Sequence, residues 1–94
     1  MVERRSDTIT ERVLTPWGET EVAVAYVDKW VCEKCGKVLV ERTEAADTGL
    51  SLFNGWGSCD HYWVLFPEAV CPKDEVIAEV SAGGETLIII KAPA

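Results

Sequence analysis

Short runs of apolar and β-branched residues alternate along this chain with groups of turn-forming residues. The runs recur at intervals of about ten residues, a spacing that is typical of all-β proteins. No segment keeps a helical pattern of apolar positions for more than about two turns. The sequence therefore predicts an all-β fold of antiparallel hairpins that form one small antiparallel-sheet domain. Its strands are expected near residues 8–15, 20–30, 38–40, 50–53, 61–66, 75–80 and 86–91.

Three of these runs also indicate how deeply the strands are buried. Residues 20–30 carry apolar side chains on both faces, which is typical of a central strand. Val76, Ala78 and Val80 alternate with more polar positions and predict a half-buried strand. Residues 87–90 are apolar throughout and predict a core strand, which at a sheet edge would instead pair with another chain.

Proline, glycine and polar residues mark the boundaries of the runs. Tight turns are predicted at residues 16–19, 54–58, 71–74 and 81–84. The polar residues 1–6 are expected to form a loose N-terminal arm, and the charged residues 41–47 are expected to end the third strand.

Length and charge narrow the classes of function. A chain of 94 residues with 48% hydrophobic residues predicts one folded domain, residues 1–94, with a thin core that a metal ion or disulfide would support. The net charge of −7 disfavours binding to nucleic acids and to anionic membranes. Residues 1–10 are polar and charged, unlike a signal peptide, so a cytoplasmic, reducing location is expected.

Cysteine spacing supplies the main candidate chemistry. Cys32 and Cys35 form a Cys-x-x-Cys pair followed by Gly36, the pattern of a metal-binding knuckle. In a reducing compartment such a pair more often binds a metal or reacts than forms a structural disulfide. Zinc needs four ligands, so a second pair is expected from residues 59–74.

Three ligand sets complete the Cys32 and Cys35 pair. The preferred set adds Cys59 and Cys71, which uses all four cysteines. In a second set His61 replaces Cys59, and in a third Cys71 and Asp74 form a degenerate second knuckle. Two alternatives to metal binding remain. The cysteines could form a disulfide, such as Cys59 to Cys71, or be buried as small apolar residues. Zinc is favoured over iron because it accepts mixed ligands, although four thiolates would suit iron.

The segment from Trp30 to Gly36, followed by Gly55-Trp56 and Val70-Cys71-Pro72, resembles small bacterial and phage zinc-ribbon proteins. The resemblance covers residues 30–74 and leaves residues 75–91 as a C-terminal hairpin outside it. It implies two zinc knuckles on β-hairpins and a binding role, with Cys32, Cys35 and Cys71 at ligand positions. Position 74 departs from the pattern, because Asp74 stands where the family has Cys or His.

The expected function is therefore a zinc-stabilised, non-catalytic binding or adaptor module that engages a protein partner. Trp17 and Trp56 lie in predicted turns and are candidate anchors for that partner. His61 is the only histidine, and the chain has no P-loop, serine elbow or dinucleotide-binding glycine motif, so enzymatic activity is not expected. The alternatives are a small virus-encoded assembly subunit that self-associates through strand edges, and a rubredoxin-like iron protein.

Overall fold

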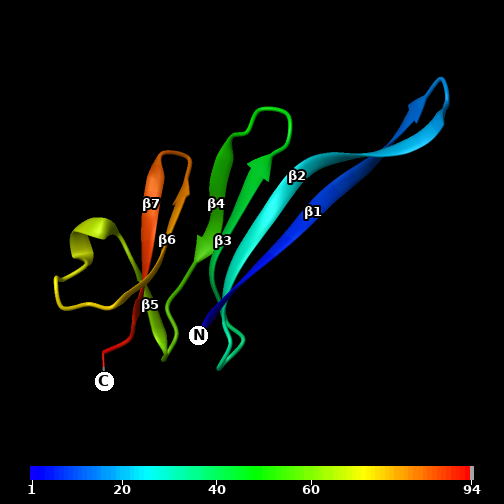
Figure 1. The fold of residues 1–94 in the computed structure, drawn as a ribbon. Helices are drawn as coiled ribbons and strands as arrows, with labels where there is room; N and C mark the ends of the chain where they lie inside the picture. Colours follow the sequence, from blue (N-terminus) through cyan, green and yellow to red (C-terminus); the bar gives the residue numbers. More distant parts are fainter. Residues whose placement is uncertain (94) are drawn as a thin grey trace.

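The computed structural model describes residues 1–93 and confirms the all-β fold (Figure 1). Seven strands and one 3₁₀ turn follow one another along this part of the chain. They are β1 (Val2–Thr15), β2 (Gly18–Cys32), β3 (Val38–Ala45), β4 (Ser51–Trp56), β5 (Tyr62–Leu65), η1 (Pro67–Ala69), β6 (Val76–Ala82) and β7 (Glu85–Lys91). Within residues 1–93 no helix is long and apolar enough to cross a membrane.

The strands divide between two antiparallel sheets. A four-stranded sheet has the order β1-β2-β3-β4, in which every neighbour in sequence is a neighbour in space. A three-stranded sheet has the order β5-β7-β6. Its central strand is β7, and Leu87, Ile88, Ile89 and Ile90 are all buried there. This agrees with the prediction of a core strand from its unbroken apolar run.

The N-terminal residues correct one prediction, because residues 2–6 are not a loose arm. β1 begins at Val2, which pairs with Cys32, and the pairing with β2 continues to the Thr15–Gly18 turn. Arg4 helps to hold these residues in the strand. Its guanidinium stacks 5.3 Å from the Trp30 ring and lies 3.3 Å from the Asp28 carboxylate. A polar sequence is thus held in a strand by contacts that local pattern does not reveal.

Two further strand boundaries differ from the sequence prediction. β3 continues through the charged stretch to Ala45, because Arg42 on that strand has a cross-strand partner in Asp28. β4 runs through Asn54 and Gly55 to Trp56, where the sequence predicts a turn. Glu41 pairs with Gly55 and Arg42 pairs with Phe53, so Asn54 is an extra residue that β4 accommodates as a bulge.

Both sheets contribute to one hydrophobic core. Trp30, Leu39 and Val40 belong to the four-stranded sheet, and all three are buried. They form a single cluster with buried side chains of the three-stranded sheet and with the Cys32 thiol: Tyr62, Val64, Val80, Leu87 and Ile89. Because this core is small, the contacts that hold the two sheets together at its margin carry unusual weight.

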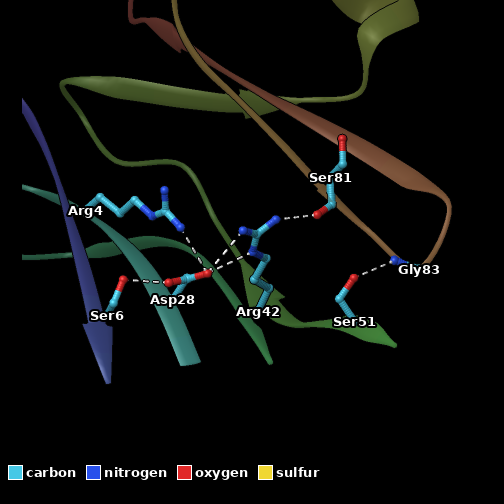
Figure 2. A network of polar contacts seen from close by, with 7 residues as sticks. All are labelled: Arg4, Ser6, Asp28, Arg42, Ser51, Ser81 and Gly83. Carbon is cyan, nitrogen blue, oxygen red and sulfur yellow. Dashed lines mark hydrogen bonds and ion pairs between the residues drawn. The ribbon is translucent and has the colours of Figure 1, made fainter. Parts of the chain in front are cut away.

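A polar network beside this core joins the sheets (Figure 2). Arg42 donates to the Asp28 carboxylate from Nε and Nη2, at 3.2 and 3.1 Å, and from Nη1 to the Ser81 carbonyl at 2.7 Å. Ser6 donates to Asp28 at 2.6 Å. Partial burial raises the pKa of Asp28, but these hydrogen bonds and the charges of Arg4 and Arg42 outweigh it and hold the pKa below its usual value.

The β1–β2 hairpin extends well past the other strands and gives the molecule extents of 60 × 28 × 15 Å (Figure 1). β3 reaches only as far as Ala25, opposite Ala45. The two strands beyond this point are called the arm, residues 10–24, and end in the turn at Pro16 and Trp17. Most of the arm is exposed, including Leu14 at 84% and Trp17 at 93%.

Candidate metal centre

The Cys32–Cys35 knuckle lies in the turn between β2 and β3. Cys32 is the last residue of β2, and its carbonyl accepts a hydrogen bond from the Gly36 N–H at 2.7 Å. Gly36 has φ of +72°, a backbone conformation that glycine adopts at little cost. The Cys32 N–H donates to the Lys37 carbonyl at 2.9 Å and closes the turn. The two hydrogen bonds and the conformation of Gly36 thus close a tight turn around the Cys-x-x-Cys pair.

The second group of candidate ligands lies between β4 and β5. Cys59 donates its N–H to the Tyr62 carbonyl at 2.9 Å, so residues 59–62 form a tight turn. Ala92 donates to the His61 carbonyl at 3.0 Å, which ties this turn to the end of β7. Lys37 donates from Nζ to the Ser58 carbonyl, which links the turn directly to the knuckle.

Four donor atoms meet between these two turns. The thiols of Cys32, Cys35 and Cys59 and a ring nitrogen of His61 all lie within 4.8 Å of one another. The Cys32 Sγ and the His61 Nδ1 are 3.7 Å apart. In a tetrahedral zinc site with ordinary bond lengths, ligand atoms are separated by about 3.5–3.8 Å. The group therefore needs only small side-chain movements to surround one metal ion.

The site is closed on one side by the core and open on the other. Cys32 is completely buried, Cys59 and His61 are half-buried, and Cys35 is exposed. Tyr62 follows His61 directly and is itself buried in the core cluster. An ion would therefore enter from the Cys35 side and come to rest against the hydrophobic core.

Local hydrogen bonds favour ionisation of one thiol. Burial raises the pKa of Cys32, but the backbone N–H groups of Cys35 and Lys34 and the thiols of Cys35 and Cys59 outweigh it and lower the pKa to about 7. For Cys35, the Lys37 N–H lowers the pKa, but the Cys32 thiol and the other surroundings raise it above its usual value. Burial, and then the negative charge at Cys32, raise the pKa of Tyr62. Cys32 is thus the thiol of this group that ionises most readily, and the thiolate is the metal-binding form of cysteine.

The ligand predictions meet mixed results. The structure brings together Cys32, Cys35 and Cys59 of the preferred set, and His61 stands in the fourth place. Cys71, which belongs to all three predicted sets, lies outside this group, as does Asp74. All four cysteines are free thiols, so the alternative of a Cys59 to Cys71 disulfide is not formed.

The turn at residues 71–74 has its own explanation. The Cys71 N–H donates to the Asp74 carboxylate at 2.8 Å, and the Asp74 N–H donates to the Cys71 carbonyl at 3.0 Å. Asp74 therefore caps a tight turn. The knuckle-like spacing of these two residues reflects turn formation.

Comparisons of the chain with protein-family models, with curated protein sequences and with solved structures found no match. The functional conclusion therefore depends on the geometry of the site itself.

Proposed function

We propose that this protein is a small, non-catalytic binding or adaptor module whose fold is stabilised by one zinc ion. Its ligands are Cys32, Cys35, Cys59 and His61. The observation that supports this proposal is the convergence of these four donor atoms within 4.8 Å, from two turns far apart in sequence. Thiol and imidazole groups are the side chains that structural zinc sites use most.

The ligand set favours zinc over iron. A mononuclear iron centre for electron transfer prefers four thiolates, whereas zinc accepts three thiolates and one imidazole. Since Cys71 lies outside the group, the described residues offer three thiols at this place. The rubredoxin-like alternative accordingly has less support.

The structural role follows from the position of the ligands. Cys32 and Cys35 lie at the end of the four-stranded sheet, while Cys59 and His61 lead directly into the three-stranded sheet. A zinc ion held by all four residues joins the two sheets. Four protein ligands leave no open position for substrate, which is the arrangement of structural zinc sites. Binding of such an ion is coupled to folding, so its removal should destabilise the fold.

The binding role is supported by an aromatic group on the surface. Trp56 packs edge-to-face against Phe53 and Phe66, with ring centroids 5.8 and 6.1 Å apart. Trp56 and Phe66 are nevertheless 47% and 44% exposed. Aromatic side chains that are rigid yet exposed are frequent anchors in protein interfaces. The net charge of −7 favours a partner protein with a basic surface.

The metal proposal is tested by native mass spectrometry of the purified protein. We expect one zinc ion per chain in the wild type, and none in Cys32→Ser. Cys71→Ser is the matched control, because it also removes one thiol but lies outside the site, and it should keep its zinc. A wild-type protein that binds no metal, or that resists heat equally with and without a chelator, would show that the proposal is wrong.

The partner proposal is tested with Trp56→Ala in a pull-down from cells that contain the protein naturally. Trp63→Ala is the control, since Trp63 is also an exposed tryptophan, at 41%. We expect Trp56→Ala to lose the bound protein and Trp63→Ala to retain it. Equal recovery with both variants would rule out Trp56 as the anchor.

A further inference from the structure

The outer edge of β1 is the longest strand edge left unpaired in residues 1–93. β1 has 14 residues and pairs with β2 alone. Natural proteins protect such edges with prolines, with bulges, or with charged side chains, lysine above all. β1 carries six charged side chains, but its three acidic residues and its three arginines balance one another. β1 contains neither proline nor lysine, and the register shift beside Thr10 places the extra residue in β2. The whole of β1 is therefore open to pairing with a further strand.

The arm also lacks the cover that a two-stranded ribbon needs. Beyond Ala25 it has no third strand, and Leu14 and Val22 are 84% and 40% exposed. A two-stranded hairpin on its own is marginally stable in water, whereas a sheet of three or more strands is stable. Pairing along β1 would supply the missing strands on that side of the arm.

The charges on β1 favour a second copy of this chain in one register. Two copies related by a two-fold axis pair antiparallel, and the longest overlaps are centred on Thr8 or Ile9. Centring on Ile9 sets Asp7 opposite the partner's Glu11, which is repulsive. Centring on Thr8 sets Arg5 opposite the partner's Glu11, twice by symmetry. Arg5 also lies 3.3 Å from Glu3 of its own strand, so its guanidinium would face two carboxylates, and these pairs are attractive.

The register centred on Thr8 also contains one kind of like-charge pair, twice by symmetry, but both of its arginines already have acidic partners in their own chain. Arg4 faces the partner's Arg12. Arg4 lies 3.3 Å from Asp28 within its own chain. Arg12 lies 3.6 Å from Glu19 and 3.9 Å from Glu21. The same register brings Val2 opposite the exposed Leu14 of the other copy, so apolar groups meet at both ends.

We propose that two copies of this protein associate through β1 in this register and form one continuous antiparallel sheet. Each arm then lies along the partner's β1, with the tip of one arm beside the base of the other. The dimer uses no residue of the metal centre, so it holds whether or not zinc is bound there.

The proposal is tested with variants in which charged residues of β1 are reversed in sign. The molar mass of each variant is measured by light scattering over a range of protein concentrations. We expect the wild type to be a dimer that dissociates on dilution. Arg5→Glu places a carboxylate opposite the partner's Glu11, twice by symmetry, and should raise the dissociation constant about tenfold or more. Lys73→Glu makes the same change in net charge on a distant turn and should have no such effect. The double variant Arg5→Glu, Glu11→Arg restores both pairs and should restore the dimer.

Hydrogen exchange locates the interface independently. Amides of residues 2–14 should become more protected as the concentration rises, while those of β6 should not change. A protein that is monomeric at every concentration overturns the proposal. So does a dimer that Arg5→Glu leaves intact, or one whose protection gained on association lies outside β1.

Discussion

Asp28 is the residue that gathers the polar contacts between β1, β2 and β3. Its carboxylate accepts hydrogen bonds from Ser6 and Arg42 and lies beside Arg4. Arg42 extends the same contacts to Ser81 on the other sheet. The two guanidinium groups also stack on the Trp30 ring, Arg42 at 5.2 Å. A single carboxylate therefore keeps two arginines in place against the core.

Replacing Asp28 with Asn should destabilise the fold in a pH-dependent way. The pKa of Asp28 is lowered in the folded state, so its contribution is present above the ordinary pKa of about 3.9 and is lost as the pH falls through the lower folded value. At pH 7 we expect Asp28→Asn to lower the free energy of unfolding by about 1–3 kcal/mol. The difference from wild type should shrink when the pH falls to about 3.

Urea unfolding of both proteins at the two pH values, with chelator present throughout, measures this difference without interference from metal release. Asp7→Asn is the control, because Asp7 is an exposed residue of β1. A loss of stability that is the same at both pH values would contradict the role given to the carboxylate charge.

The candidate ligands illustrate how far a sequence can predict a site. Cys32 and Cys35 were predictable because a local turn, closed by Gly36, brings them together. The sequence predicts Cys59 and His61 as ligands only in place of each other. In the structure they lie in a turn before β5, where the Cys59–Tyr62 hydrogen bond lets both reach the knuckle. Cys71 lies outside this group, and only the tertiary structure reveals that.

The β6–β7 turn contacts the β3–β4 hairpin of the other sheet. The Gly83 N–H donates to the Ser51 hydroxyl of β4 at 3.3 Å (Figure 2). A Cβ on Gly83 would lie 2.9 Å from the Ser51 carbonyl oxygen. The backbone of one sheet thus approaches the other too closely for any side chain.

Two neighbouring glycines allow this contact to be measured. Gly83 and Gly84 have φ of +60° and +80°, and of these two only Gly83 has atoms within 4 Å of an added Cβ. Each change to alanine should cost about 1 kcal/mol for its backbone conformation. Gly83→Ala should cost about 1 kcal/mol more, because the sheets must separate. Chemical denaturation compares the two variants, and equal losses would mean that the contact adds nothing.

Strand boundaries were predictable where the residues of a strand specify it by themselves. The apolar run of β7 and the turn at Pro16 and Trp17 are local features, and both predictions were confirmed. The charged half of β3 was not predictable, because Arg42 is stabilised by Asp28 on a different strand. The first residues of β1 were not predictable for the same reason, because Arg4 and Ser6 contact Asp28 on β2. Alternation along a strand indicates which face is buried, but it does not identify the partner strand.

Across the whole molecule, the group of candidate ligands and the polar network lie at two separate points between the sheets. The four-stranded order follows the sequence, but β7 lies between β5 and β6, so its sheet requires pairing between more distant segments. The division into two sheets depends on these pairings and was therefore not predicted. The candidate ligands Cys59 and His61 lie in the segment that connects the sheets, residues 57–61.

Removing the metal should accordingly loosen one part of the molecule more than the rest. We expect a chelator to speed hydrogen exchange at residues 57–65 and at the Cys32–Lys37 turn by about tenfold or more. The tip of the arm lies far from the site and should exchange at the same rate in both states. Mass-spectrometric exchange of the wild type with and without chelator measures this. A uniform increase over all strands would indicate that the metal stabilises the fold globally.

The central position of β7 has a consequence for the order of events during synthesis on the ribosome. All four strands of the first sheet precede residue 57, so that sheet leaves the ribosome before the strands of the second. β5 and β6 then emerge without the strand that must lie between them. Until β7 follows, Trp30, Leu39 and Val40 have no opposing layer. We therefore expect the nascent chain to expose its apolar face during that interval and to bind chaperones there.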